Sequence, residues 1–197
     1  MTISIPVATP RFWWHAPVGQ IQSWVSTDPD VDDGRLRWSD RDRQRWALIA
    51  GVVADVGDAL AEGAWDTDSE NDQYGFVSVH LDSGTLTATE LKITSSWFQQ
   101  AEAVRVDPWS DSLTNGRHRL WATLPHFQRR QVPVCSDALG YANPSDAEAI
   151  GAIWPSLYAT NLEQVTALDW FDDSDPLNRT FVSSLRTAAN GVLPSAL

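Results

Sequence analysis

Cysteine, lysine and methionine are nearly absent from this chain of 197 residues, which has one of each. The single cysteine, Cys135, excludes an intramolecular disulfide framework and a cysteine-rich metal site, and we expect it to be a small buried hydrophobe. Long apolar runs are also missing, because the longest, 46–54, ends at Asp55 and is too short to cross a bilayer. The first residues lack the basic segment and continuous apolar stretch of a signal peptide. Together these absences predict a cytoplasmic protein.

Positive charge is scarce, since 14 basic residues face 26 acidic ones and the formal net charge is −12. Such a charge disfavours non-specific association with nucleic acid or anionic membrane, so we expect neither direct DNA binding nor membrane binding. The basic residues are unevenly distributed, and most fall in two windows, 35–45 and 105–130. The second window contains only two acids, Asp107 and Asp111. It is therefore locally positive and can focus a small anion.

Tryptophan is unusually frequent for its type, with 11 copies among 197 residues. The apolar content of 43% and the charged content of 20% are ordinary for a folded protein. No internal repeat or flexible linker divides the chain, so we expect a single domain over 1–197. Each buried indole needs a partner for its N–H group.

The fold class that the patterns predict is α+β, with a small mixed sheet flanked by a long N-terminal helix and C-terminal helices. Apolar residues recur at helical spacing between 46 and 60, with Ser39 as the expected N-cap, Asp42 at the third helical position and Gly63 as the C-cap. Residues 11–15 are expected to form a short strand or an arm. Residues 76–81 and 85–93 are expected to form a β-hairpin around the turn at 82–84.

The remaining segments alternate between strands and helices. We expect a short helix at 96–101, a strand at 103–106, a strand ending at 113–114 and a helix at 117–124 that Pro125 terminates. Residues 131–134 are expected to form a strand in which Pro133 marks an edge or strand-end position. Beyond them, a helical part is predicted over about 144–190.

The turn between the strand ending at Thr114 and the following helix breaks a rule of helix formation. Acidic residues are favoured in the first helical turn, yet this helix would begin with Arg117, His118 and Arg119. The arrangement becomes favourable when an anion sits in front of the helix and receives both the backbone N–H groups and the guanidinium groups. Asn115 and Gly116 can adopt the tight-turn conformations required, and glycine gives the anion access to the backbone. The turn is therefore a candidate phosphate site.

Two alternatives to this interpretation remain open at the level of local chemistry. Asp107 and Asp111 precede the turn and can pair with Arg117 and Arg119, which would leave a purely structural cluster of ion pairs. The turn can also form a loop without a helix, which would remove the argument from the helix dipole.

The segment 113–122, LTNGRHRLWA, followed by QVPV at 131–134, resembles the phosphate-binding box of the ParB/sulfiredoxin superfamily. Gly116, His118, Arg119 and Ala122 fall on its Gly-x-His-Arg pattern, and the resemblance covers about 103–136. It implies a ParB-like core at about 74–136. It also implies that the turn contacts nucleotide phosphates, as with CTP in ParB proteins and ATP in sulfiredoxin.

The chain departs from both branches of the superfamily. Arg117 stands where sulfiredoxin has its catalytic cysteine, so sulfinic acid reduction is not expected. The ParB box containing Glu-Asn and Gln-Arg is missing from 137–197, and no helix-turn-helix can be assigned there. A role in chromosome segregation is therefore not expected either.

Other candidate chemistry near the turn is open to more than one interpretation. Asp107 and Asp111 can hold Mg²⁺ beside a nucleotide, and the competing role is a helix cap or a salt bridge. Trp109 and Trp121 flank the turn and can stack on a base, and the competing role is core packing. The four histidines lack the spacing of a helical metal site, so no metal centre is predicted from them.

The sequence thus supports two functional hypotheses. The first is a ParB-like protein that binds a small anionic ligand, either a phosphate or a nucleotide such as CTP or ATP with Mg²⁺. Weak hydrolysis of the nucleotide is compatible with this hypothesis, although no catalytic base is evident in the sequence. The second is a non-catalytic, acidic, Trp-rich interaction module or nucleic-acid mimic that meets a protein partner, because tryptophan is enriched in interface hot spots.

Overall fold

The structure is a computed structural model, in which part of the chain is described. The described residues are 1–8, 12–16, 18–27, 43–64, 66–67, 74–81, 84–99, 101–107, 112–127, 131–136 and 158–159, together with positions 174, 176 and 179.

Two sheets organise these residues. The smaller is antiparallel and has the strand order β1 (Thr2–Ala8), β4 (Tyr74–His80) and β3 (Asp66–Thr67). Side chains alternate across β1, where Ile3, Ile5 and Val7 are buried while Thr2 and Ser4 are exposed. This period of two buries one face of the sheet against the helices.

The larger sheet is mixed. Its order is β6 (Ser112–Asn115), β5 (Arg105–Asp107), β7 (Val132–Ser136), β2 (Phe12–Ala16) and β8 (Tyr158–Ala159). β5 pairs antiparallel with β6 and parallel with β7, while β2 pairs antiparallel with β7 and parallel with β8. The small mixed sheet and the α+β class predicted from the sequence are both confirmed.

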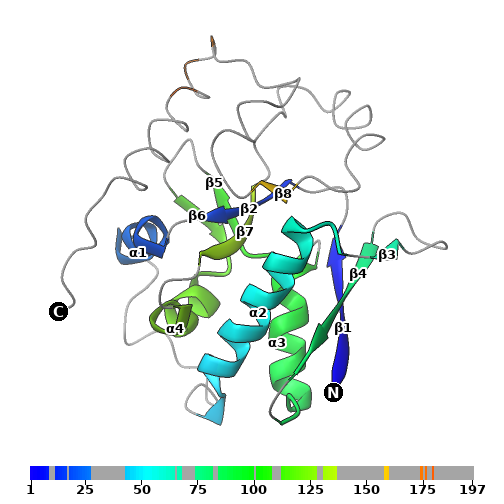
Figure 1. The fold of residues 1–197 in the computed structure, drawn as a ribbon. Coiled ribbons are helices and arrows are strands. Elements are labelled where there is room, and N and C mark those ends of the chain that lie inside the picture. The colour runs from blue at the N-terminus through cyan, green and yellow to red at the C-terminus, as the bar shows by residue number, and fades with distance from the viewer. Residues whose placement is uncertain are drawn as a thin grey trace.

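Four helices pack around these sheets within the described part of the chain: α1 (Val18–Thr27), α2 (Trp46–Ala61), α3 (Ala88–Phe98) and α4 (Arg117–Phe127). α2 occupies the centre of this part, with α4 on one side and β4 on the other (Figure 1). Its buried face includes Ile49, Val53 and Val56, which join the core formed by both sheets. The long N-terminal helix predicted from apolar spacing is therefore confirmed in its body.

The predicted start of that helix is wrong, whereas its end is confirmed. Residues 43–45 are not part of the α-helix, so α2 begins at Trp46 and not near Ser39, which lies with Asp42 outside the described residues. At the other end Gly63 adopts a φ of 70° and its N–H donates to the Leu60 carbonyl at 3.1 Å. This is the left-handed termination that glycine favours.

The predicted β-hairpin is also wrong. Residues 76–80 do lie in a strand, β4, but β4 pairs with β1 and β3. The expected return strand at 85–93 is instead a short connection followed by the start of α3 at Ala88. The physical reason is a capping box: the Thr87 hydroxyl accepts from the Glu90 N–H at 3.2 Å and the Glu90 carboxylate accepts from the Thr87 N–H at 2.8 Å. These two bonds satisfy donors that a helix start leaves open.

Of the two predictions made from proline residues, the one for Pro125 is wrong and the one for Pro133 is confirmed in part. Pro125 does not terminate the helix, because α4 continues to the buried Phe127, whose ring packs 5.9 Å from that of Trp97. Pro133 lies on β7, a central strand, and not on an edge. It is the second residue of β7, so the strand-end position that was the other expectation for it is confirmed.

Other predictions had mixed outcomes. The strand at 11–15 is confirmed as β2, and Cys135 is buried as expected. β1 and α1 were not predicted. The predicted C-terminal helical part lies largely outside the described residues, although Tyr158–Ala159 within it form a strand. Buried indoles find N–H partners, as Trp97 shows by donating to the Pro133 carbonyl at 2.8 Å.

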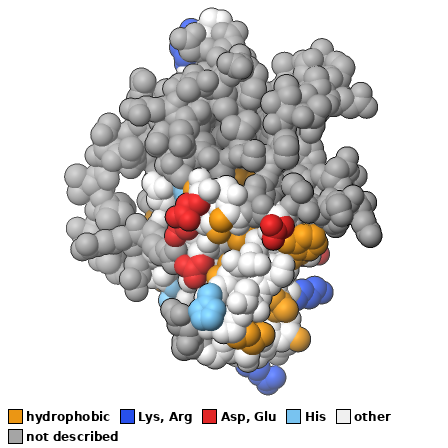
Figure 2. All heavy atoms as spheres, turned by 45° about the vertical axis from the view of Figure 1, so that its right-hand side comes forward, with side chains coloured by type: hydrophobic (Ala, Val, Ile, Leu, Met, Phe, Trp, Pro, Cys, Tyr) orange, Lys and Arg blue, Asp and Glu red, His pale blue; other side chains and the backbone are white. Residues whose placement is uncertain are grey.

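The surface of the described part is mixed in character. On the face in Figure 2, carboxylates and hydrophobic side chains lie in small separate groups among polar atoms. Among the described helices, none is both long and apolar enough to cross a membrane.

Candidate functional site

The turn predicted as a phosphate site joins β6 directly to α4. Gly116 lies at the junction with a φ of 90°, and its carbonyl accepts the first helical hydrogen bond, from the Leu120 N–H at 2.9 Å. The Asn115 side chain oxygen accepts from the Gly116 N–H at 2.8 Å. The strand-turn-helix unit predicted from the sequence is confirmed, and the alternative of a loop without a helix is not.

Close packing against Val104 also explains why this position needs glycine. A Cβ atom at Gly116 would lie 2.7 Å from Val104 Cγ2 and 3.0 Å from Val104 Cα, in addition to the strain of a positive φ. The sequence suggested that glycine is there to admit an anion. The structure supplies a requirement within the protein itself, because Val104 is part of the hydrophobic core.

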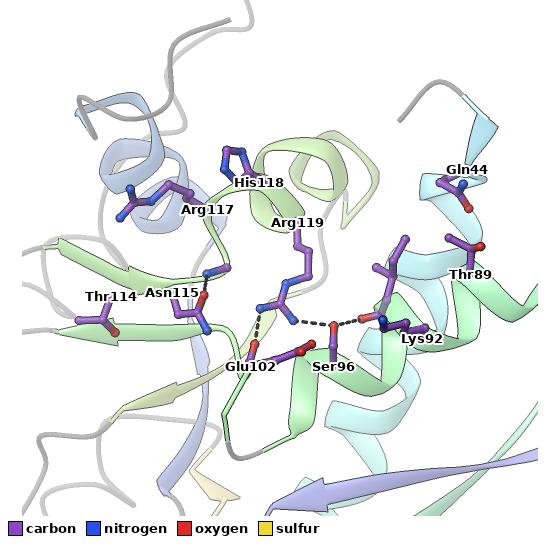
Figure 3. Close-up of a pocket in the computed structure, with 12 residues that line it drawn as sticks. Gln44, Thr89, Lys92, Ser96, Glu102, Thr114, Asn115, Arg117, His118 and Arg119 are labelled. Atoms are coloured by element: carbon purple, nitrogen blue, oxygen red, sulfur yellow. Dashed lines mark hydrogen bonds between the residues drawn. The ribbon is translucent and has the colours of Figure 1, made fainter. Parts of the chain in front are cut away.

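A cavity of about 630 Å³ opens between the start of α4 and the side of α3. The volume falls within the range of sites for small molecules and cofactors. Figure 3 shows the first turn of α4 on one side and the residues of α3 on the other. The lining residues are Gln44, Thr89, Lys92, Ile93, Ser96, Glu102, Thr114, Asn115, Gly116, Arg117, His118 and Arg119.

Arg119 connects the two walls of this cavity. Its side chain is only 8% exposed, and its guanidinium donates to the Ser96 hydroxyl at 2.9 Å and to the main-chain carbonyl of Glu102 (Figure 3). Burial lowers the pKa of Arg119 to about 10, against the attraction of the nearby Glu102 charge, so the side chain stays protonated at neutral pH. Arg119 thus adds a fixed positive charge to the wall.

The other two basic residues of the first turn point elsewhere. Arg117 is half-buried and His118 is exposed, and Figure 3 shows their side chains diverging from that of Arg119. Successive helical residues are about 100° apart, so three consecutive side chains cannot converge on one point. Arg117 and His118 therefore line the cavity at places separate from Arg119.

The α3 wall was not found from the sequence. Thr89, Lys92, Ile93 and Ser96 line the cavity at positions i, i+3, i+4 and i+7 of one helix. This spacing places them on one face. The signal was present but hidden, because residues 85–93 were expected to form a strand, in which these positions would alternate between two faces.

Two further lining residues were also missed. Gln44 lies just before α2, and Glu102 lies in the connection between α3 and β5. No local pattern in the sequence marks either position. Both reach the site only because α2, α3 and α4 pack together.

The remaining predicted site residues are only partly placed. Asp107 is the last residue of β5, although its side chain is not described, and Asp111 and Trp109 lie outside the described residues. Trp121 is half-buried, packs against the hydrophobic core and is not among the lining residues, as the core-packing interpretation expected. Within the described part, no three His, Cys, Asp or Glu side chains gather as a metal centre would require.

The described lining has a positive balance despite the acidic character of the whole protein. Lys92, Arg117 and Arg119 contribute three cationic groups, and Glu102 contributes one carboxylate. The start of α4 adds the positive end of a helix dipole, and no acidic residue occupies its first turn. Amide and hydroxyl groups complete the polar part, and these can orient a bound molecule by hydrogen bonds.

These residues fit a nucleotide in size and charge. Phosphate oxygens match the cationic and helix-start side of the cavity. For Mg²⁺, the donor set on the described lining is the single Glu102 carboxylate, which is compatible with an ion bound mainly through phosphate oxygens and water.

No family model, no curated protein and no solved structure matches this chain.

Proposed function

We propose that this protein binds the phosphate group of a small anionic ligand, a nucleotide such as CTP or ATP with Mg²⁺, in the cavity between α3 and α4. The observation that carries the proposal is that Lys92, Arg117 and buried Arg119 line one cavity of about 630 Å³ together with the start of a helix. Each group alone is common at protein surfaces. Their combination in a concave site is what favours an anion.

Electrostatics supports binding at this location over the rest of the surface. A net charge of −12 repels anions from the molecule as a whole, so a bound phosphate requires local positive charge. Arg119 provides such charge where water is largely excluded, and there a cation acts on an anion more strongly than in bulk solvent.

The proposal concerns binding and not turnover. Ser96 is the buried hydroxyl residue on the described lining, and its hydroxyl donates to the Ile93 carbonyl at 2.9 Å while it accepts from Arg119. A hydroxyl held in this way is not paired with a general base, as an activated nucleophile would be.

The test is a thermal-shift and calorimetry series with inorganic phosphate, CTP, ATP and GTP in the presence of Mg²⁺. A ligand that binds only the folded state raises its stability, by about 2.7 kcal/mol at a hundred times its dissociation constant. We expect at least one nucleotide to stabilise the wild type. In Lys92→Gln and Arg117→Gln the affinity should fall by about tenfold or more, because each removes one charged contact to phosphate.

Arg179→Gln is the matched control, since Arg179 is exposed and does not line the cavity. Arg119 is a poor choice for this test, because its loss would also undo the bonds to Ser96 and Glu102. If no nucleotide or phosphate raises the melting temperature, or if the Arg179 variant loses binding as strongly as the cavity variants, the proposal is wrong.

The alternative of an acidic, Trp-rich interaction module is a separate hypothesis that the described side chains do not favour. Trp13, Trp24 and Trp97 are buried, and Trp46 and Trp121 pack partly buried against the core. In the described part, tryptophan therefore serves internal packing.

A further inference from the structure

The carboxylate of Glu102 has no obvious place in a site for phosphate. It is the one acidic residue on the described lining, and it is exposed there among cationic groups. Two anionic groups in one cavity repel each other, so a bare polyphosphate would be disfavoured beside it. For a bare anion, the one favourable effect of this side chain is its attraction for the Arg119 guanidinium.

The position of the Glu102 carboxylate is not fully explained by an interaction with Arg119. Arg119 donates its hydrogen bonds to two neutral oxygens, the Ser96 hydroxyl and the main-chain carbonyl of residue 102. The second bond would exist with any side chain at that position. The Glu102 charge does attract Arg119, but burial has the larger effect on the guanidinium.

We infer that Glu102 coordinates a divalent cation carried by the ligand, and that the cavity therefore selects a metal-complexed polyphosphate over the free anion. Mg²⁺ prefers oxygen ligands and is commonly bound through one or two carboxylates together with phosphate oxygens. With the cation between them, the carboxylate and the phosphates attract the same ion and no longer repel each other. This inference rests on the proposed phosphate-binding function and names the form of ligand that the site takes.

The charges of the described lining agree with this selection. Three cationic side chains and one carboxylate suit a polyphosphate whose charge is partly neutralised by Mg²⁺. Lys92 and Arg117 contact the phosphate side, while Glu102 serves the metal side. Glu102 is in this view a specificity-determining residue that distinguishes two forms of the same ligand.

The experiment measures the affinity for inorganic tripolyphosphate and for ATP by calorimetry, each with Mg²⁺ and with EDTA, in the wild type and in Glu102→Gln. Glutamine keeps the main-chain carbonyl that Arg119 uses and removes only the negative charge. Glu62→Gln is the matched control, because Glu62 is exposed at the far end of α2 and outside the cavity. Thermal unfolding of each variant establishes that it is folded.

We expect the wild type to bind the Mg²⁺ complexes at least about tenfold more tightly than the free anions. In Glu102→Gln this preference should fall to within about twofold, because the Mg²⁺ complexes lose a carboxylate ligand and bind less tightly, while the free anions no longer meet a repelling charge. Glu62→Gln should retain the wild-type preference.

The outcomes separate this inference from the proposed function. Binding of tripolyphosphate that is equal with and without Mg²⁺ in the wild type, or a preference that survives in Glu102→Gln, overturns the role of Glu102 and leaves phosphate binding intact. Loss of ATP affinity in Glu102→Gln with unchanged tripolyphosphate binding also overturns the role of Glu102 in metal binding. That result would indicate that the carboxylate accepts a hydrogen bond from an amino group of the base. Absence of binding in every condition overturns both.

Discussion

Gly116 is the single residue on which the geometry of the site depends most directly. Its φ of 90° and the 2.7 Å approach that a Cβ would make to Val104 Cγ2 are independent obstacles to any other residue. We expect Gly116→Ala to lower the free energy of unfolding by about 2–4 kcal/mol, combining backbone strain with overpacking.

Gly51→Ala is the matched control for that substitution. Gly51 lies inside α2, and a Cβ there would have nothing within 4 Å. Because alanine has a higher helix propensity than glycine, we expect Gly51→Ala to be up to about 1 kcal/mol more stable than the wild type. Chemical denaturation of both variants measures the difference, and equal effects at the two positions would contradict the role given to Val104.

Among the described carboxylates, Glu90 is the one whose pKa is clearly lowered, so it links stability to pH. Its side chain is almost fully buried and accepts from the Arg45 guanidinium at 2.9 and 2.5 Å and from the Arg45 main-chain N–H at 3.0 Å. Bonding to Arg45 lowers the pKa of Glu90 to about 2 from 4.5, against the opposing effect of burial. The carboxylate thereby joins the start of α2 to the start of α3.

The lowered pKa of Glu90 predicts the direction of acid destabilisation. Between pH 2 and 4.5 the Glu90 carboxyl is protonated in the unfolded chain but ionised in the folded protein. The stabilisation by the ionised carboxylate is therefore complete above pH 4.5 and is lost as the pH falls toward 2. We expect Glu90→Gln to be less stable than wild type at pH 7. As the pH falls through that window, the free energy of unfolding of Glu90→Gln should decrease less steeply than that of the wild type. The difference in slope should be about that caused by the binding of one proton. Urea unfolding at a series of pH values measures both slopes, and parallel curves would contradict the prediction.

Single residues of the site were predictable from the sequence only where a local rule was broken. Three basic or titratable residues at a helix start are unusual, and this drew attention to Arg117, His118 and Arg119. Lys92 and Glu102 break no local rule, and their place in the site comes from packing. The use of Arg119 as a bridge to Ser96 was also beyond sequence reasoning, because it depends on the distance between two helices.

At the scale of elements, the assignment of α3 decided how much of the site could be anticipated. The segment 85–93 is rich in threonine and has good strand propensity, but Thr87 and Glu90 form a capping box. Capping bonds outweigh propensity here because they satisfy main-chain donors that would otherwise lack partners. The expected strand at 85–93 gave no reason to place Lys92 and Ser96 on one face, whereas the observed helix places both on the α3 wall of the cavity.

The capping box itself gives a prediction for α3. We expect Thr87→Ala to lower the free energy of unfolding by about 1 kcal/mol, because the Glu90 N–H loses the side-chain oxygen that accepts it. Thr87→Ser should restore most of the stability, since serine offers the same acceptor. Thr85→Ala is the control, because among the described residues the only bond of Thr85 is the one that its main-chain carbonyl accepts from Arg45.

Thermal unfolding of the three variants, combined with binding of the nucleotide that stabilises the wild type most, tests this element. If Thr87→Ala were as stable as Thr85→Ala, the cap would contribute nothing. A variant that is weakened in stability but retains full affinity would show that the α3 wall survives a frayed first turn.

At the scale of the whole molecule, the sequence predicted the class of fold but not its topology. Apolar spacing identified the body of α2, and the Asn-Gly turn identified the junction of β6 with α4. The pairing of β1 with β4, and of β2 with β7, joins segments far apart in the chain. No local pattern specifies such partners, since any strand with one apolar face can cover the core.

The net charge of −12 leads to a prediction about the protein as a whole. Like charges distributed over one small protein repel each other, and this repulsion is stronger in the compact folded state than in the expanded unfolded chain. Added salt screens it over a distance of about 10 Å at 0.1 M. We therefore expect the melting temperature of the ligand-free protein to rise by about 2–4 °C between low salt and about 0.2 M NaCl, if the relief is about 1 kcal/mol.

Screening depends on ionic strength and not on the identity of the ions, which separates this effect from binding of phosphate in the cavity. NaCl and KCl should therefore give the same rise at equal ionic strength. Sodium phosphate at that ionic strength should give a larger rise in the wild type, and the excess should shrink in Lys92→Gln. If chloride salts lowered the melting temperature, attractive ion pairs would dominate the fold and the view of a self-repelling domain with one anion-attracting cavity would be wrong.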